Sequence, residues 1–541
     1  MSIAFQSPLI GTILAYPAVG VHALCSVVVG KRFNMSDARG HVHSARRHLP
    51  VGISGLDDVL DGGLIRGGLY LLLGAPGTGK TTAANQICFS RAREGDVAVY
   101  GTVLVESHAR MLTHLEGFHF FDPSQVARNV HYVSLLDELT ASGLDGALGL
   151  LRRVVRERGA ALLIVDGAGL FGEFAPSPLE FRRFAAELHT QVSALGCTTV
   201  LLASPEDPYV RLLGPHVDGV IELEDARVGM RDVRLLHVVK LRASNPLRGR
   251  HAYAIDARGM VVFPRLEATT PETVTVSAGD VVTSRVARPR LAFGVVGLDD
   301  MVRGGLPATS STLLLGTAGA GKTVTGLHFI NEGSQQGDRT LIVSSQETPA
   351  RLLAKATDLG LDLASHVEAD LVRILWQPPG ELSLDAWALE LLTVIDDYRP
   401  ARLFCDELGD VAVRAAYPDR LPLFLAALVT ALRERVVTVI FAVELRRLVG
   451  EELEIPPSGF PVDLDNVLLV RSVEWRSHLH RLVSVIKLRD GDHDTAIREF
   501  RISSRGVEVS NDFASAESVM TGIARDTALV TGGSGTGGRG G

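Results

Sequence analysis

Short, strongly hydrophobic runs alternate with longer amphipathic stretches along most of the chain. The apolar runs in the first part of the chain predict strands at Tyr70–Leu73, Val103–Val105, Leu162–Val165 and Thr198–Leu202. Between them lie stretches with helical periodicity, such as Leu179–Leu195. Runs that are apolar on both faces are typical of parallel strands covered by helices on both sides. The pattern therefore predicts α/β domains, each with a mostly parallel sheet covered by helices on both faces.

The chain carries the same pattern twice. The segment GLDDVLDGGL at 55–64 returns as GLDDMVRGGL at 297–306, and GAPGTGKT at 74–81 returns as GTAGAGKT at 316–323. An apolar run ending in an aspartate and a Lys-Leu-Arg segment also recur, in the same order and at nearly the same spacing. Such a series indicates two copies of one domain of about 220 residues.

The two copies define the domain organisation. We expect an N-terminal extension at 1–47, a first domain at 48–265, a linker at 266–288, a second domain at 289–515 and a flexible Gly-rich tail at 516–541. The linker is rich in Thr, Val and Ser and has no helical periodicity. The tail has no side chains that could form a core.

The N-terminal extension is unusually apolar. Residues 1–30 contain no charged side chain, and the stretch 8–29 is long enough to cross a bilayer. Gly11, Pro17 and Gly20 interrupt it, and no basic segment precedes it as a secretory signal requires. A disordered extension, a membrane or interaction segment and a packed extension stay open as interpretations.

The composition is that of a folded protein, and we expect it to be cytoplasmic. Hydrophobic residues make up 46% and charged residues 21%, which excludes a disordered chain and a coiled-coil rod. A net charge of -8 argues against a nucleic-acid binder that works by neutralising phosphates. No C-x-x-C pair is present, so we expect buried thiols in a reducing compartment at Cys25, Cys88, Cys197 and Cys405.

The strongest candidate for chemistry is a glycine-rich loop that occurs in both copies. It follows an apolar run, precedes a helical stretch and ends in Gly-Lys-Thr. In such a loop backbone N–H groups surround phosphate oxygens, the lysine reaches the β- and γ-phosphates, and the threonine hydroxyl binds Mg²⁺. We therefore expect ATP and Mg²⁺ at Gly74, Gly77, Thr78, Gly79, Lys80, Thr81 and Thr82, and again at Gly316, Gly319, Ala320, Gly321, Lys322, Thr323 and Val324.

Two aspartates complete the expected metal sites. Asp166 and Asp406 each end an apolar strand, where a carboxylate can hold Mg²⁺ beside the loop. An aspartate at a strand end can also simply begin a turn. Because both lie at corresponding places in the repeat, we expect Asp166 to act with Thr81 and Asp406 with Thr323.

With these motifs the chain resembles the RecA superfamily and, within it, the KaiC family of tandem-domain circadian-clock ATPases. The resemblance covers roughly residues 48–515 and includes GCTTVLL at 196–202, the two Lys-Leu-Arg segments and HDTAIREFRIS at 493–503. It implies two tandem RecA-like P-loop domains and a homo-hexameric double ring with ATP at the subunit interfaces. It also implies that the neighbour's nucleotide is reached by Lys240, Arg242, Lys487 and Arg489.

Lysine usage supports that implication. Six of the 54 basic residues are lysines, and four of the six lie in the two P-loops and the two Lys-Leu-Arg segments. A compact ammonium on a flexible stem suits a phosphate. Lys240 and Lys487 could otherwise be solvated charges at strand ends.

The resemblance also implies a catalytic Glu-Glu pair after the strand that follows the P-loop helix, and both copies depart from it. The first copy reads VLVES, with Glu106 in the leading position, and the second reads SSQET, with Gln346 leading and Glu347 following. Because glutamine cannot accept a proton, we expect hydrolysis mainly in the first domain, with Glu106 as base. Glu347 or Glu407 would overturn this asymmetry if either acted as the base.

The autophosphorylation of the family has little support in the sequence. The matching stretch has Pro461 and Val462 at the phosphoacceptor positions, and Ser458 carries its one hydroxyl. We expect an ATPase whose nucleotide state switches its contacts with a regulatory protein partner. A Ser/Thr autokinase, a RecA-type DNA-dependent ATPase and an ATP-binding scaffold without turnover are the alternatives.

Overall fold

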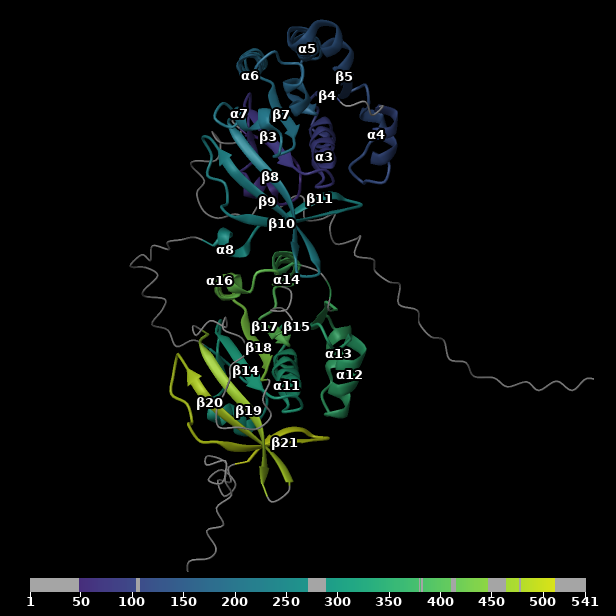
Figure 1. The fold of residues 1–541 in the computed structure, drawn as a ribbon. Coiled ribbons are helices and arrows are strands. Elements are labelled where there is room, and N and C mark those ends of the chain that lie inside the picture. The colour runs from purple at the N-terminus through teal and green to yellow at the C-terminus, as the bar shows by residue number, and fades with distance from the viewer. Residues whose placement is uncertain are drawn as a thin grey trace, which may run out of the picture. The chain divides into compact units, whose positions relative to one another are not determined.

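The computed structural model describes residues 48–103, 108–270, 289–378, 380, 383–409, 415–445, 464–475 and 478–510 (Figure 1). The apolar stretch 8–29, most of the predicted linker and the tail therefore lie outside the described residues. In the part that is described, no helix is both long enough and apolar enough to cross a membrane.

Each copy contains one large sheet. The strands of the first are β3 (Leu69–Gly74), β4 (Ala98–Thr102), β5 (Val130–Ser134), β6 (Leu162–Asp166), β7 (Thr198–Ala203), β8 (Gly219–Val228), β9 (Arg231–Leu241), β10 (Arg250–Asp256) and β11 (Gly259–Phe263). Those of the second are β14 (Ser311–Gly316), β15 (Thr340–Ser344), β16 (Val372–Trp376), β17 (Arg402–Asp406), β18 (Thr438–Glu444), β19 (Asn466–Trp475), β20 (His478–Leu488), β21 (Arg498–Ser503) and β22 (Gly506–Val509). Two short ribbons precede them, β1 (His48–Leu49) with β2 (Leu64–Ile65) and β12 (Arg290–Leu291) with β13 (Leu306–Pro307).

The two sheets have the same strand order. The first runs β11-β10-β9-β8-β3-β7-β6-β4-β5, and the second runs β22-β21-β20-β19-β14-β18-β17-β15-β16. From β8 to β5, and from β19 to β16, neighbouring strands are parallel. The three remaining strands of each sheet add as antiparallel neighbours at one edge. The repeated order confirms the two tandem RecA-like α/β domains.

Helices cover both faces of each sheet (Figure 1). In the first domain they are α2 (Leu56–Val59), α3 (Lys80–Arg93), α4 (His108–Leu115), α5 (Leu136–Arg158), α6 (Pro178–Ser193) and α7 (Pro208–Leu213), followed by α8 (Leu266–Thr269) at the start of the predicted linker. In the second they are α10 (Val296–Met301), α11 (Lys322–Gln335), α12 (Pro349–Asp358), α13 (Leu363–Glu368), α14 (Leu384–Tyr398) and α16 (Leu421–Glu434).

The central strands explain why both faces need cover. Along β3, Tyr70 and Leu72 join the core that includes residues of α3, whereas Leu69 and Leu71 join the core that includes residues of α5 and α6. Successive side chains of a strand point to opposite faces, so a strand that is apolar throughout must be buried on both. The expected buried thiols at Cys88, Cys197 and Cys405 are confirmed, and Cys25 lies outside the described residues.

One predicted strand begins later than the strand that the structure describes. The run Val103–Val105 was expected to be a strand; Leu104 and Val105 lie outside the described residues, and the described strand is β4, which ends at Thr102. Gly101 interrupts the hydrophobic run of β4, so the sequence pattern does not reveal the strand. A Cβ at Gly101 would lie 3.0 Å from Leu135 Cδ1, so packing against the helical face requires the small residue inside the strand.

The second domain holds a fully buried arginine. Arg402 begins β17, and its guanidinium donates to the Asp338 carboxylate at 3.2 Å and to the carbonyl oxygens of Ala292 and Phe329 at 2.7 and 3.1 Å. A further N–H donates to Gln336 Oε1 at 3.0 Å. Because the charge is both paired and hydrogen-bonded, its burial is tolerated.

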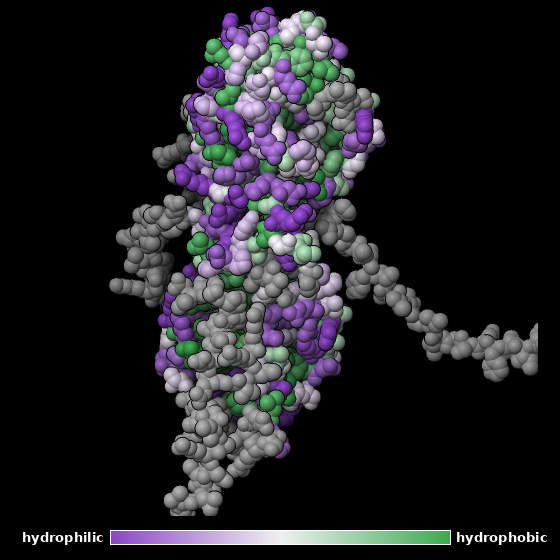
Figure 2. All heavy atoms as spheres, in the orientation of Figure 1, coloured by the Kyte–Doolittle hydropathy of each residue, from purple (hydrophilic) through white to green (hydrophobic). Residues whose placement is uncertain are grey.

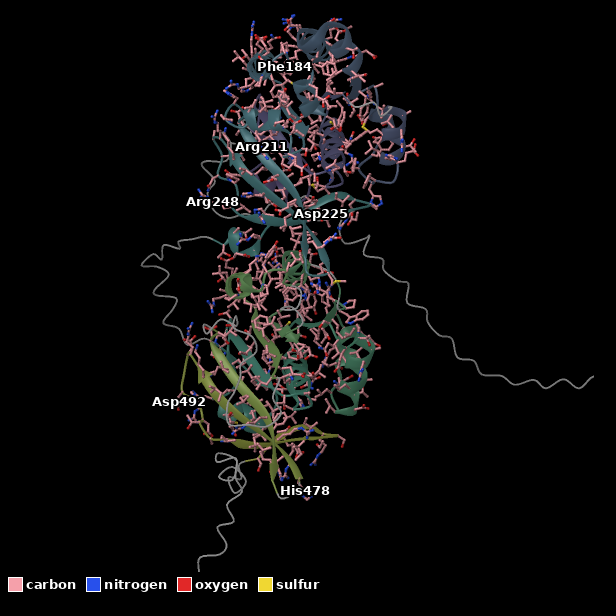
Figure 3. The ribbon with its side chains drawn as sticks, in the orientation of Figure 1. Phe184, Arg211, Asp225, Arg248, His478 and Asp492 are labelled. Carbon is pink, nitrogen blue, oxygen red and sulfur yellow. The ribbon has the colours of Figure 1, made fainter. Side chains whose placement is uncertain are left out.

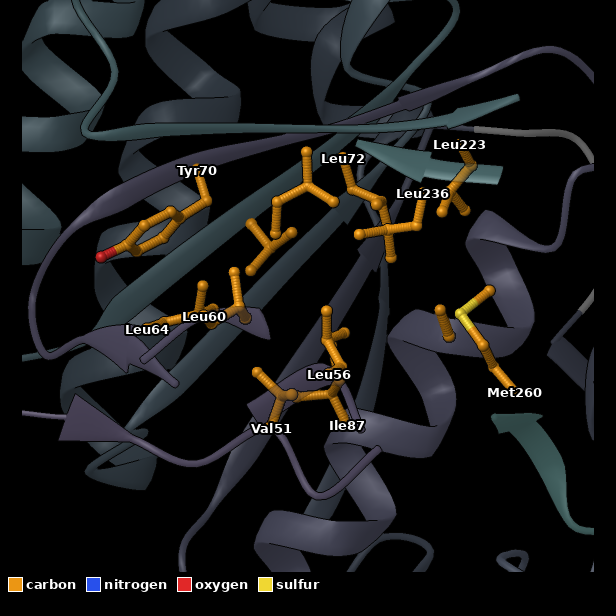
Figure 4. A pocket seen from close by; sticks show the side chains of 13 residues that line it. Val51, Leu56, Leu60, Leu64, Tyr70, Leu72, Ile87, Leu223, Leu236 and Met260 are labelled. Carbon is orange, nitrogen blue, oxygen red and sulfur yellow. The ribbon is translucent and has the colours of Figure 1, made fainter. Parts of the chain in front are cut away.

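A small cavity in the first domain lies within the core (Figure 4). Its lining is hydrocarbon apart from the Met260 sulfur and the Tyr70 hydroxyl, which donates to the Ile65 carbonyl at 3.1 Å. At about 20 Å³ it is far too small for a nucleotide, so it is a packing gap and not a binding site.

Candidate functional site

Each glycine-rich loop ends at the start of a long helix. Gly79 and Gly321 are the N-cap residues of α3 and α11, with φ of 93° and 109°. The positive φ favours glycine, and a Cβ on Gly79 would also lie 2.2 Å from Ile255 Cδ1 and displace that side chain. The first N–H groups of α3 and α11 have no partner within the helix and are available to an anion at this end.

The loop lysines lie over their own loops. Lys80 Nζ donates to the carbonyl oxygens of Gly74 and Ala75 at 2.6 and 3.0 Å. Lys322 makes the equivalent two bonds at 3.0 and 3.2 Å. Burial lowers the pKa of Lys80, and the charge of Asp166 acts in the opposite direction. Both ammonium groups are therefore placed at the mouth of the loop that would receive phosphates.

The other predicted loop residues contribute mainly through the backbone. Ala320 and Val324 pack into the core of the second domain, so only their N–H groups could meet a nucleotide. Thr78 is buried, and its hydroxyl donates to the Ala75 carbonyl at 2.9 Å. The hydroxyl of Tyr253, on β10, donates to the Thr78 carbonyl at 2.7 Å. Sequence reasoning missed this support of the loop, because β10 is far away along the chain.

The structure brings together both residues of each predicted metal pair. Thr81 Oγ1 donates to Asp166 Oδ2 at 3.1 Å, and Thr323 Oγ1 donates to Asp406 Oδ1 at 3.1 Å. Hydroxyl and carboxylate oxygens are hard ligands that suit Mg²⁺. Among the described residues no group of three or more His, Cys, Asp or Glu could hold a metal. The donor set therefore fits an Mg²⁺ that takes its remaining ligands from phosphates and water.

The first site contains a residue that sequence reasoning missed. The hydroxyl of Tyr100, on β4, donates to Asp166 Oδ2 at 2.7 Å and is buried. Burial raises the pKa of Tyr100 well above its ordinary value, and the Asp166 charge adds to this effect. The corresponding position of β15 holds Ile342, which has no donor. Asp166 thus accepts from two hydroxyls, whereas among the described residues Asp406 accepts from the hydroxyl of Thr323 alone.

Several carboxylates lie at the second site. Burial raises the pKa of Asp406 to about 6, and the charge of Glu347 adds to this rise. Burial also raises the pKa of Glu407 to about 6. The Glu407 carboxylate accepts the N–H of Glu444 at 3.3 Å, and Glu444 Oε2 lies 3.7 Å from Lys322 Nζ. Glu407 has φ of 68°, an uncommon backbone angle for a residue with a side chain.

Of the two candidate bases, the structure describes the position of Glu347 and not that of Glu106. Glu106 lies outside the described residues, so the structure gives no position for it. Glu347 is described, and its carboxylate accepts a hydrogen bond from Lys355 Nζ. Counted from the strand ends, Glu106 is four residues after Thr102 and Glu347 is three after Ser344. Glu106 therefore corresponds more nearly to Glu347 than to Gln346, with which the sequence motif aligned it.

The Lys-Leu-Arg segments lie at the end of the sheet where the parallel strands begin, and the phosphate loops lie at the other end, where these strands finish. The start of β8 pairs with the start of β3, and β9 runs back to end beside the start of β8. Lys240 and the P-loop are therefore separated by the length of β3, roughly 17 Å at ~3.3 Å per residue. From this end of the strands, Lys240 and Arg242 cannot reach a nucleotide bound at the phosphate loop of their own domain.

The same contacts hold both segments. Lys240 Nζ donates to the Val217 carbonyl at 2.7 Å, and Lys487 Nζ donates to the Leu464 carbonyl at 2.7 Å. Arg242 pairs with Asp218 at 3.9 Å, and Arg489 pairs with Asp465 at 3.3 Å. In Figure 3, His478 at the start of β20 and Asp492 just after its end lie apart, which shows how far that strand carries the chain across the sheet.

Two P-loops, each with a helix N-terminus, a lysine and a Thr–Asp pair, define a tandem P-loop nucleotide-binding protein of the RecA type. The family model of the KaiC ATPase matches residues 49–267 and again 291–513. The chain belongs to the KaiC ATPase family.

Curated relatives support this assignment along nearly the whole chain. The chain is 25% identical over 498 residues to the circadian clock oscillator protein KaiC of Parasynechococcus marenigrum, covering 90% of this chain and 94% of that protein. It is 26% identical over 503 residues to KaiC of Thermostichus vulcanus, covering 88% and 91%, and 26% identical over 496 residues to KaiC of Synechococcus elongatus, covering 89% and 92%.

Proposed function

We propose that this protein is a cytoplasmic ATPase that assembles into a ring and whose nucleotide state switches its contacts with a protein partner. The observation that carries the proposal is the pair of P-loops, each with a lysine over the loop and a threonine hydroxyl 3.1 Å from a strand-end carboxylate. Such a site positions MgATP for in-line attack by water, and this positioning accounts for most of the catalysis in the P-loop class.

We place hydrolysis mainly in the first domain. Glu106 is the candidate base there, and Tyr100 and Thr81 both donate to Asp166. In the second domain Glu347, the nearer counterpart of Glu106, is engaged by Lys355 and is therefore not free to accept a proton from water. The carboxylates of Glu407 and Glu444 near Lys322 also oppose the negative charge of a triphosphate.

Assembly is proposed because the Lys-Leu-Arg cations lie too far from the phosphate loop of their own domain to contact a nucleotide there. A second copy that presents this edge to the P-loop would complete the site, with Arg242 and Arg489 acting as arginine fingers. The face in Figure 2 mixes hydrophilic and hydrophobic side chains. Val239 and Ile486 stand one residue before the two lysines and are 53% and 55% exposed, which suits burial against a neighbour. A heterologous contact of this kind closes into a ring when the rotation between neighbours closes. The family resemblance makes a hexamer the expected size.

The competing functions make different predictions. A DNA-dependent ATPase would show turnover stimulated by single-stranded DNA, and a scaffold would bind ATP without releasing phosphate. An autokinase would gain mass in steps of one phosphate after incubation with ATP. Its candidate acceptor, Ser458, lies outside the described residues.

Phosphate release by the full chain tests the catalytic part of the proposal. Lys80→Ala should remove most of the activity, and the matched Lys322→Ala should remove a minor part, because the two loops are assigned unequal turnover. Glu106→Gln should reduce the rate by ~10²–10⁴ while leaving ATP binding intact. Equal rates for wild type and Glu106→Gln would refute the assignment of the base.

Light scattering after gel filtration tests the assembly. The mass should rise to that of a hexamer with ATP. Lys240→Ala should reduce phosphate release without weakening ATP binding to the isolated subunit. A monomer that hydrolyses ATP at the wild-type rate would contradict the proposed role of the neighbour.

A further inference from the structure

Lys355 is the one described lysine that lies in neither a P-loop nor a Lys-Leu-Arg segment. It stands on α12, and its ammonium donates to the carboxylate of Glu347. The two side chains are 32% and 19% exposed, so this ion pair is partly shielded from water. A chain that uses arginine almost everywhere else has placed a compact cation at this point.

The ion pair is held from both sides. Leu352 and Ala356 of α12 are fully buried in the core of the second domain, so the helix that carries Lys355 cannot move freely. On the other side, the N–H of Glu347 donates to Ser344 Oγ at 3.2 Å. Both ends of the pair are therefore anchored to the domain.

The pair lies beside the second metal site. Ser344 pairs with Asp406 at the ends of β15 and β17, and Glu347 follows three residues later. The charges of Glu347 and Lys355 both act on Asp406, in opposite directions. Glu347 is thus close to the place where a γ-phosphate and its attacking water would lie, but one of its carboxylate oxygens is occupied.

We propose that Lys355 is a positioning residue that holds Glu347 away from the attacking water and so keeps ATP hydrolysis in the second domain slow. This inference rests on the proposed function. A general base must reach the water within hydrogen-bond distance, and Glu347 can do so only after the ion pair opens. Its second carboxylate oxygen is buried and has no hydrogen-bond partner among the described residues, which leaves an acceptor for water once the side chain turns.

The corresponding helix of the first domain carries a different residue at this position. Met111 and Leu115 are the buried residues of α4, with the same spacing as Leu352 and Ala356 of α12. This correspondence places His114 where α12 has Lys355. The difference matches the unequal turnover assigned to the two domains.

The test uses the full chain with the first site disabled by Lys80→Ala. In that background Lys355→Met, which keeps the length of the side chain but removes its charge, should raise kcat for phosphate release by about tenfold, as expected when a partly buried ion pair of ~1.4 kcal/mol no longer has to open. KM for MgATP should stay the same, because in the described part of the chain the ammonium of Lys355 bonds to Glu347 and not to the phosphate loop. Lys355→Arg, which keeps the cation, should give little of this gain.

A further variant separates release of Glu347 from a general loosening of the domain. Adding Glu347→Gln to Lys355→Met should abolish the gain, because no carboxylate is then freed. A lower or unchanged kcat for Lys355→Met, or a gain that survives Glu347→Gln, would overturn the inference. Failure of the proposed function is a separate result: the wild-type chain would then bind no ATP or release no phosphate.

Discussion

Replacing Asp406 by asparagine should stabilise the second domain when neither Mg²⁺ nor nucleotide is present. Asp406 is 8% exposed, and burial raises its pKa from 3.8 to about 6. The difference is about two pH units, and at ~1.4 kcal/mol per unit the charged carboxylate destabilises the fold by at most ~3 kcal/mol at pH 8. Asparagine keeps an oxygen that accepts from Thr323 but carries no charge.

The sign of the pH dependence follows from proton uptake. Between pH 3.8 and about 6 the folded domain holds a proton on Asp406 that the unfolded chain has released, so the stability of the wild type rises as the pH falls through 6. The advantage of Asp406→Asn should therefore be largest above pH 7 and should shrink towards zero near pH 4. Burial also raises the pKa of Glu407 to about 6, so Glu407 adds to the same pH dependence in the wild type and in Asp406→Asn.

Tryptophan fluorescence makes the measurement specific to one domain. The three tryptophans, Trp376, Trp387 and Trp475, all lie in the second copy, so urea unfolding followed by their emission reports that domain. The matched first-domain variant Asp166→Asn should leave the transition unchanged. A variant Asp406→Asn that is no more stable than wild type at pH 8 without Mg²⁺ would refute the reasoning that burial, and not a favourable contact, sets the state of this carboxylate.

Three further substitutions test other contacts. Tyr100→Phe removes the hydroxyl that donates to Asp166 and should weaken Mg²⁺-dependent ATP binding in the first domain by about 1 kcal/mol. Calorimetry at several Mg²⁺ concentrations would detect this loss of affinity. An unchanged affinity would argue against a role of Tyr100 in orienting Asp166. Arg402→Ala leaves buried acceptors unpaired and should lower the free energy of unfolding of the second domain by about 3–5 kcal/mol, as followed by tryptophan emission; a loss below about 1 kcal/mol would contradict the buried network. Gly79→Ala forces a Cβ within 2.2 Å of Ile255 at φ of 93° and should abolish ATP binding to the first domain, whereas Gly79→Ala with Ile255→Ala should recover it only in part because the backbone strain remains.

Much of the fold could be predicted from the sequence because the signals are local. A central strand such as β3 is apolar throughout and leads directly into a glycine-rich loop, so its burial on both faces and its place beside the phosphate site follow from a few residues. The Thr–Asp pairs could be anticipated for the same reason, since a repeat places each member at a fixed landmark. The position of β4 could not be predicted because Gly101 interrupts its hydrophobic run. The reason for that glycine is its packing against Leu135, which is too far along the chain for a local hydrophobic pattern to reveal.

The contacts that tune the sites could not be predicted in this way. Tyr100 supports Asp166 across two paired strands, and Tyr253 supports the first loop from a strand about 175 residues further along the chain. The antiparallel extension of each sheet was also missed, because strands that alternate polar and apolar residues look alike whichever neighbour they pair with. The pairing of Lys355 with Glu347 depends on how α12 packs, which only tertiary structure defines.

The Lys-Leu-Arg cations and the phosphate loop lie at opposite ends of the strands of one sheet, so in the proposed assembly each subunit has one surface that supplies cations and another that accepts them. A symmetric dimer with an isologous interface could not bring the cations of each copy to the loop of the other. An open linear oligomer would always leave the terminal subunit with a phosphate loop that no neighbouring cation reaches. Mixing a subunit defective only in supplying cations with one defective only in accepting them should therefore restore some working junctions, in a proportion set by chance meeting of the intact surfaces.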